Sequence, residues 1–359
     1  MRDVFSTRQP DPIHYPRVQA VRAIVVLVMV VGYASTMPLG PEAVEMGTVF
    51  GIQPSWVAIQ LLFLVSGFLA MRSLDRHGSG LRMLCSRAMR NLPLLALVTA
   101  VVAGLVYPVL RVETGMSPRE LMAYFAMTVS CADPGGVMPG ALDDAHYACL
   151  LQGAVWTFRW GAVAYLGLAS VNALGVLRDD RVVLLGAVAA TLAFAVTDYT
   201  AAKTGDPVLA TAATGLRLLY PFAVGMALWK YRRLVLTAKD NRLAATSLAI
   251  VALAAAVAAL NHTLMPWTPL IGIGLFAAAG TVTMRALLGR GPAWSWLDDW
   301  PPLALPMFLL NWPVAQVWLH FVPQITPAQL VGVTIATVLA VALALRADMH
   351  GHGMRRATA

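Results

Sequence analysis

Long apolar runs separated by short polar segments dominate the chain. A bilayer core about 30 Å thick requires about 20 predominantly apolar residues in each spanning helix. Measured against that length, the sequence contains ten candidate spans, which predict an all-α, polytopic membrane bundle of about ten transmembrane helices. The candidate spans are residues 20–38, 55–74, 92–110, 153–176, 182–200, 208–229, 243–261, 267–287, 301–321 and 328–346.

The basic residues divide unevenly between the two sets of loops. If the N-terminus is cytoplasmic, the inner segments hold 20 of the 26 lysines and arginines, and the outer loops hold only Arg111, Arg119 and Lys203. Cytoplasmic loops collect basic residues, so we expect both termini to be cytoplasmic and the protein to lie in the inner (plasma) membrane. The formal net charge of +8 then reflects orientation in a lipid membrane rather than binding of nucleic acid.

Composition supports the same class of protein. Hydrophobic residues make up 58% of the chain and charged residues 12%, against about 25% charged residues in ordinary globular domains. This excludes a soluble enzyme, and ten spans leave no room for a separate soluble domain. We therefore expect one domain over residues 1–349 and a short, disordered cytoplasmic tail over residues 350–359.

The longest outer segment, residues 112–152, carries its own signals. Its apolar piece Leu121–Val129 is too short to cross a bilayer and predicts a re-entrant or surface helix. The Pro/Gly-rich stretch Pro134–Gly140 predicts a loop able to cover a site. Cys131 and Cys149 share this segment, where they either form a disulfide or serve as packing residues. With Cys85 they have no metal-ligand spacing, so we expect no metal.

Three arginines fall within the predicted spans. A central arginine costs about 2.5–3.5 kcal/mol on insertion scales and normally faces a polar cavity or a partner. Arg22 is close enough to its helix end to reach the surface, Arg159 less easily so, and Arg217 lies in mid-span. We expect no carboxylate of the spans to neutralise them. Guanidinium is suited to phosphate or carboxylate, so this pattern favours an anionic ligand.

Arg22 and Tyr33 are 11 positions apart in the first span, which is close to three helical turns. They therefore lie on one helix face, about 16 Å apart. This spacing suits a long ligand that crosses the membrane. It equally suits an arginine anchor and a tyrosine hydrogen-bonded to another helix.

Six local patterns, in this order, resemble the integral-membrane acyltransferase 3 family. The resemblance covers about residues 17–346. The patterns are Arg22-x10-Tyr33, Leu61-Leu-Phe-Leu-Val-Ser-Gly-Phe68, Arg87-x-x-Arg90-x-x-Pro93, Val155-Trp156-Thr157-Phe158, Tyr220-Pro-Phe-x-x-Gly225-Met and Phe308-Leu-Leu-Asn-Trp-Pro313.

The resemblance implies an enzyme that moves an acyl group, usually acetyl, from cytoplasmic acyl-CoA to a hydroxyl of an outward-facing glycan or a lipid-linked sugar. Acyl-CoA is then a donor substrate, and no bound cofactor is expected. Ser66 with Arg82, Arg87 and Arg90 would meet the CoA, although positive-inside anchoring explains the arginines equally well. The implied catalytic residues are Tyr33, Arg22, Trp156, Arg159, Arg217 and Asn311.

Three positions depart from the family pattern. Tyr33 and Asn311 stand where the family carries histidine, and Gly161 stands where it usually carries glutamate. General-base catalysis contributes typically 10²–10⁴ in rate, and a tyrosine with a pKa near 10 is almost fully protonated at pH 7. Either a phenolate at Tyr33, favoured by the arginines, or an outer histidine would have to replace the base. The outer histidines are His146, His262 and His320.

Three functions follow from these patterns. The first is an acyltransferase with altered catalytic groups, and the second is an inactive relative that binds acyl-CoA, a lipid-linked sugar or a protein partner. The third is a transporter of an anionic solute. In each case we expect a cavity around the first, second, fourth, sixth and ninth spans, with the small-residue-rich fifth, seventh and eighth spans as scaffold.

Overall fold

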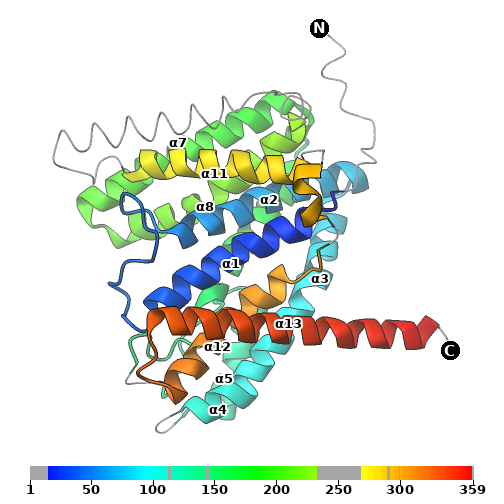
Figure 1. The fold of residues 1–359 in the computed structure, drawn as a ribbon. Coiled ribbons are helices and arrows are strands. Elements are labelled where there is room, and N and C mark those ends of the chain that lie inside the picture. Colours follow the sequence, from blue (N-terminus) through cyan, green and yellow to red (C-terminus); the bar gives the residue numbers. More distant parts are fainter. Residues whose placement is uncertain are drawn as a thin grey trace.

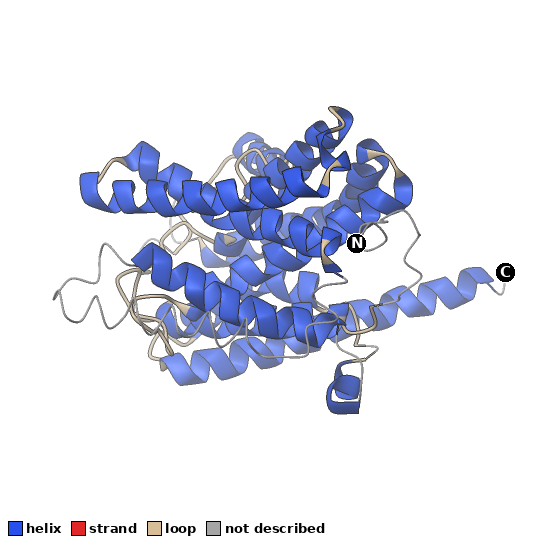
Figure 2. Cartoon of the chain, turned by 90° about the horizontal axis from the view of Figure 1, so that it is seen from above, coloured by secondary structure: helices blue, strands red, loops and turns tan. Residues whose placement is uncertain are grey.

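The computed structural model describes residues 15–111, 115–142, 145–232, 268–288, 292–298 and 300–357. Within these residues the regular structure consists of helices, without any β-strand (Figure 2). This confirms the all-α class. It is explained by the apolar environment, in which a helix satisfies all its backbone hydrogen bonds internally.

Nine of the ten predicted spans coincide with helices, and the tenth, 243–261, lies outside the described residues. One of the nine begins as α3 and continues through a π-helical segment, Val102–Val106, into α4. The helices are α1 (Val18–Thr36), α2 (Pro54–His77), α3 (Gly80–Val101), α4 (Tyr107–Leu110), α6 (Thr157–Ala173), α7 (Asp180–Thr204), α8 (Pro207–Lys230), α11 (Thr268–Leu288), α12 (Ala304–Phe321) and α13 (Pro327–Ala357).

Seven helical segments of the described chain are long and apolar enough to cross a membrane, which makes this a multi-pass membrane protein. They are α1, α2, Gly80–Leu110, α7, α8, α11 and Pro327–Ala344. α6 and α12, also predicted as spans, have 17 and 18 residues and are not among the seven. Both carry polar side chains, such as Arg159 in α6 and Asn311 in α12, which lower their hydropathy.

The helices form two groups around α1. On one side α2 packs against α1 and α8, and α8 packs against α7; on the other side α12 and α13 pack against α1 and against each other (Figure 1). α1 and α3 begin, and α2 ends, at the same end of the bundle. We call it the basic end, after Arg17, Arg76 and Arg82. The end at which α1 finishes and α2 begins is the opposite end.

Two motif glycines allow α2 and α8 to touch. A Cβ at Gly67 would collide with the carbonyl oxygen of Phe222, and a Cβ at Gly225 would collide with that of Leu64. Only glycine lets the two backbones approach this closely. The contact fixes α2 against α8 over the middle of both helices.

The outer segment contains the short helix that its sequence predicts. α5 (Pro118–Val129) begins with a capping box in which Ser117 and Glu120 bond each other's backbone. These bonds from Ser117 lower the pKa of Glu120. Cys131 and Cys149, for which a disulfide was one of two alternatives, are not joined in a disulfide.

Three short 3-10 helices complete the described chain: Gly153–Trp156, Val176–Arg178 and Pro292–Leu297. The first leads directly into α6 and the second lies between α6 and α7. At the C-terminus, residues 350–357 form the last turns of α13 (Figure 1). The division into a domain of 1–349 and a separate tail stays a prediction.

Candidate functional site

A cavity of about 480 Å³ lies between α1, α2, α3, α6, α8 and α12. Its volume is within the range of small-molecule sites, about 300–1,000 Å³. Five of these helices are those around which we predicted a cavity, and α3 is the addition. Val129, Ser130 and Cys131, which end α5 and follow it, close one side.

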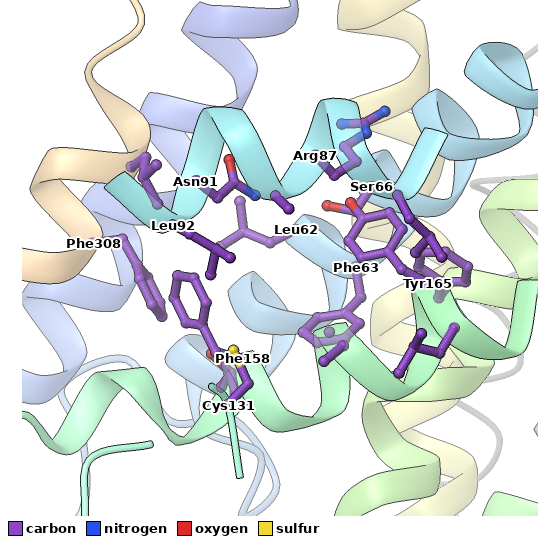
Figure 3. Close-up of a pocket in the computed structure, with 18 of the residues that line it drawn as sticks. Leu62, Phe63, Ser66, Arg87, Asn91, Leu92, Cys131, Phe158, Tyr165 and Phe308 are labelled. Carbon is purple, nitrogen blue, oxygen red and sulfur yellow. The ribbon is translucent and has the colours of Figure 1, made fainter. Parts of the chain in front are cut away.

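Aromatic and aliphatic side chains make up most of the cavity wall. Figure 3 shows the rings of Phe63, Phe158, Tyr165 and Phe308 around the space, with α3 along one side. Polar side chains are few in the lining, and they include Arg22, Ser66, Arg87 and Asn91. The cavity therefore combines a long apolar wall with a cationic side.

Arg22 and Arg87 supply the positive charge. The buried Nε of Arg22 has no hydrogen-bond partner among the described residues. Arg87 is 9% exposed, and its guanidinium lies 5.6 Å from the ring centre of Tyr165. Neither forms a salt bridge with a carboxylate of the described chain. A half-buried cation, Arg22, and a buried one, Arg87, neither with a carboxylate partner in the described chain, favour an anionic ligand in this cavity.

Arg217, the expected mid-span cavity arginine, is placed differently. Its Nη2 donates to Asp198 Oδ1 at 2.7 Å, and its guanidinium lies 4.5 Å from the ring centre of Trp56. The expectation that no carboxylate of the spans neutralises these arginines is therefore wrong, because Asp198 lies at the end of the predicted span 182–200. The pair joins α7 to α8, and neither residue lines the cavity.

Arg159 also stays outside the cavity. Its guanidinium donates to the carbonyl oxygen of Ala132, with Nε at 2.9 Å, and lies 3.7 Å from Asp133 at the surface. Thr157 and Phe158, its neighbours in the same motif, do line the cavity. Arg159 thus fastens the start of α6 to the segment after α5.

Tyr33 lies at the opposite end of α1 among aromatic rings. Its ring contacts Trp312 edge-on with 5.4 Å between ring centres, and Tyr147 also contacts Trp312 edge-on, with 5.3 Å between ring centres. The indole of Trp312 donates to the carbonyl oxygen of Leu150 at 2.8 Å. The charged group that acts on Tyr33 is the carboxylate of Glu45, not an arginine. Tyr33 therefore has an anion nearby, and Arg217 and Arg159, which were expected to support a phenolate, are held by other groups.

Glu45 is the functional candidate that the sequence did not indicate. It lies between α1 and α2 and is 5% exposed, whereas its neighbours Val44 and Met46 are 71% and 60% exposed. Ser55 donates to it from both its backbone N–H, at 3.0 Å, and its hydroxyl. Burial raises the pKa of Glu45 above its usual range, and the bonds from Ser55 oppose the shift.

The remaining expected residues have mainly structural contacts. Asn311 is 2% exposed, donates to the carbonyl oxygen of Phe308 and leaves its Oδ1 without a partner among the described residues. Trp156 packs against Trp56 at 5.9 Å. Arg82 and Arg90 are exposed on α3, and Ser66 lines the cavity.

Gly161 and the outer histidines complete the comparison with the expected site. Gly161, the position of the usual glutamate, lines the cavity, and a Cβ there would meet open space. His146 lies against Gly40, and His320 contacts Phe321. His262 lies outside the described residues.

The six sequence motifs converge on the cavity. Each contributes at least one lining residue, although the motifs are spread over most of the chain. The family model of the acyltransferase 3 family, an acyltransferase domain, matches residues 15–346. The chain belongs to the acyltransferase 3 family. No match was found among curated proteins or among solved structures. In this member of the family, the lining residues of the six motifs are Arg22, Leu62, Phe63, Ser66, Arg87, Thr157, Phe158, Phe222 and Phe308.

Proposed function

We propose that this protein is an O-acyltransferase of the cell's inner (plasma) membrane. It takes an acyl group, most simply acetyl, from cytoplasmic acyl-CoA and transfers it to a hydroxyl of an outward-facing glycan or a lipid-linked sugar. The observation that carries the proposal is the cavity, which combines an aromatic wall with two arginines that have no carboxylate partner among the described residues, and which is lined by all six family motifs.

The two parts of the cavity match the two parts of an acyl-CoA. Arg22 and Arg87 hold an anionic group, because guanidinium binds phosphate oxygens with geometry that lysine does not provide. Arg82 and Arg90 lie on the exposed side of α3, the helix that carries Arg87, and add positive charge for the remaining phosphates. The uncharged arm and its acyl group lie along Phe63, Phe158 and Phe308, where burial of apolar surface stabilises them.

The inactive and transport alternatives make different demands. A transporter of anions would use a row of free cations through the bundle, but Arg217 and Arg159 are held by Asp198, Ala132 and Asp133. An inactive relative would bind acyl-CoA in the same cavity without turnover. Activity measurements therefore have to report binding and transfer separately.

The proposal is tested with purified protein in nanodiscs, radiolabelled acetyl-CoA as donor and octyl glucoside as acceptor probe. We expect labelled ester from the wild type, with KM for acetyl-CoA raised at least tenfold by Arg22→Gln or Arg87→Gln. Arg119→Gln, an exposed arginine on α5, is the matched control and should behave like the wild type.

Three results would contradict the proposal in distinguishable ways. Binding of acetyl-CoA without any ester would favour the inactive relative. Anion uptake into vesicles without dependence on CoA would favour a transporter. Equal kinetics for Arg22→Gln, Arg87→Gln and Arg119→Gln would show that the cavity does not bind the donor.

A further inference from the structure

Acyl transfer to a hydroxyl requires a group that accepts the hydroxyl proton, and the family's histidine at position 33 is a tyrosine here. The cavity wall supplies no replacement, since its lining contains no aspartate, glutamate or histidine among the described residues. A replacement must therefore come from an adjoining part of the molecule.

The adjoining part lies at the opposite end of the cavity. Ser55 precedes the lining residue Ile59 by one turn of α2, and Trp312 follows the lining residue Phe308 by one turn of α12. Tyr33 follows the lining residue Val26 by two turns of α1, about 10 Å. The three helices thus bring these residues together one to two turns beyond the cavity, toward the opposite end of the bundle. With Glu45 and Tyr147 we call them the Glu45 cluster: Tyr33, Glu45, Ser55, Tyr147 and Trp312.

The chain holds the Glu45 carboxylate in this cluster by several contacts. The backbone carbonyl of Glu45 accepts hydrogen bonds from Thr48 N–H at 3.1 Å and from Thr48 Oγ1 at 2.8 Å, and these bonds close a turn that begins at Glu45. Its carboxylate lies over Gly32, where a Cβ would be 2.6 Å from Oε2. Gly32 immediately precedes Tyr33, so the bare surface of α1 at Gly32 makes room for the carboxylate beside the family's histidine position.

We propose that Glu45 is the proton acceptor for acyl transfer in this protein, in place of the histidine that the family carries at position 33. This inference rests on the proposed function. The acceptor hydroxyl oxygen bonds to the acyl carbon, and the C–S bond of the thioester breaks. The hydroxyl proton passes to the Glu45 carboxylate and then to water, while the leaving thiolate takes a proton from water. The products are an ester and free CoA thiol.

The surroundings of Glu45 suit this role. The Glu45 carboxylate acts electrostatically on Tyr33 of α1 and on Tyr147 of the segment before α6, and Ser55 of α2 donates hydrogen bonds to it. His146 stands beside Tyr147, with its ring against Gly40. Among the described residues no lysine or arginine forms a salt bridge with Glu45. A base without a cationic partner keeps its proton affinity, and a pKa nearer to neutral makes it more effective.

Glu45→Gln is the direct test, because glutamine keeps the size and the oxygen that accepts from Ser55 N–H. With radiolabelled acetyl-CoA and octyl glucoside, we expect kcat to fall by about 10²–10⁴ while KM for acetyl-CoA changes less than twofold. Glu42→Gln, an exposed glutamate of the same loop, should retain wild-type kcat. Adding Tyr33→His to Glu45→Gln should restore part of the lost rate.

The pH profile supplies a readout that a structural role would not give. Ionised Glu45 is the active form, so wild-type kcat/KM should fall as the pH drops through a pKa above the usual carboxyl range. Glu45→Gln should lose this limb and His146→Gln should keep it.

If the wild type is active and Glu45→Gln is equally active in the same assay, the role of Glu45 is overturned and the proposed function stands. A loss explained entirely by a lower melting temperature or weaker acetyl-CoA binding would overturn it as well. If neither the wild type nor any variant transfers the acyl group although acetyl-CoA binds, the proposed function is overturned, and the role of Glu45 with it.

Discussion

At the scale of single residues, Gly32 shows how a missing side chain positions a charged one. A Cβ there would lie 2.6 Å from Glu45 Oε2 and 2.9 Å from Ser55 Cβ. Gly32→Ala therefore has to displace the carboxylate or the start of α2, and overpacking typically costs about 1–3 kcal/mol. We expect a lower melting temperature in detergent. Gly167→Ala in α6, where a Cβ meets nothing within 4 Å, is the control and should melt like the wild type. Equal melting temperatures for both variants would refute this packing.

The Asp198–Arg217 pair is a second residue-scale case. Asp198→Asn leaves the arginine without its charged partner, although the ring of Trp56 still faces it. An unsatisfied buried polar group costs about 1–3 kcal/mol, and the partial exposure of this pair favours the lower end. We expect Asp198→Asn to lower the melting temperature, and the double variant Asp198→Asn/Arg217→Met to recover most of the loss. Additive losses in this double-mutant cycle would mean that the two side chains act independently.

At the scale of helices, the motif glycines determine how closely α2 and α8 approach. Gly67→Ala places a Cβ against the backbone of Phe222, which is itself a cavity residue. We expect both the melting temperature and the affinity for acetyl-CoA to fall, because the wall moves with α8. Gly186→Ala on the exposed face of α7 meets nothing within 4 Å and is the control. If Gly67→Ala binds acetyl-CoA as tightly as Gly186→Ala does, the helix contact does not shape the cavity.

The helices were predictable because hydropathy is a local signal, and the errors occur where local signals mislead. The third span was predicted to start at residue 92, but α3 starts at Gly80, since Arg82, Arg87 and Arg90 lower the hydropathy and Pro93 resembles a helix start. This hid the contribution of α3 to the cavity. Pro93 instead lies inside the helix, where its neighbours in a membrane bundle tolerate it.

The site was less predictable than the fold because its polar contacts are tertiary. Arg22, Ser66 and Arg87, which the family motifs indicated as site residues, line the cavity, and their roles in catalysis and CoA binding stay predictions. Nothing in the sequence around Glu45 has helical or strand periodicity, and only the return of its loop over Gly32 buries it. The partner of Arg217 was missed for a related reason, because Asp198 is 19 residues away and meets it only when α7 packs on α8.

At the scale of the whole molecule, the charge distribution predicts which face of the membrane each end of the bundle meets. Cys85 is an exposed residue near the start of α3, at the basic end, and it also lines the cavity. Val44, at the opposite end, is 71% exposed. In a Cys131→Ser/Cys149→Ser background, we expect an impermeant maleimide to label Cys85 only from the cytoplasmic face and Val44→Cys only from the outer face.

The same labelling connects orientation to donor binding without any need for turnover. Acetyl-CoA that occupies the cavity covers Cys85, so it should slow the labelling of Cys85 and leave that of Val44→Cys unchanged. Arg22→Gln should weaken this protection, because it removes a cation from the cavity, whereas Glu45→Gln should retain it.

Labelling of both thiols from one face would refute the predicted topology. Protection that survives Arg22→Gln in full would mean that the donor binds elsewhere. A donor that enters from the basic end and a base at the opposite end would together make the cavity a path for the acyl group across the membrane.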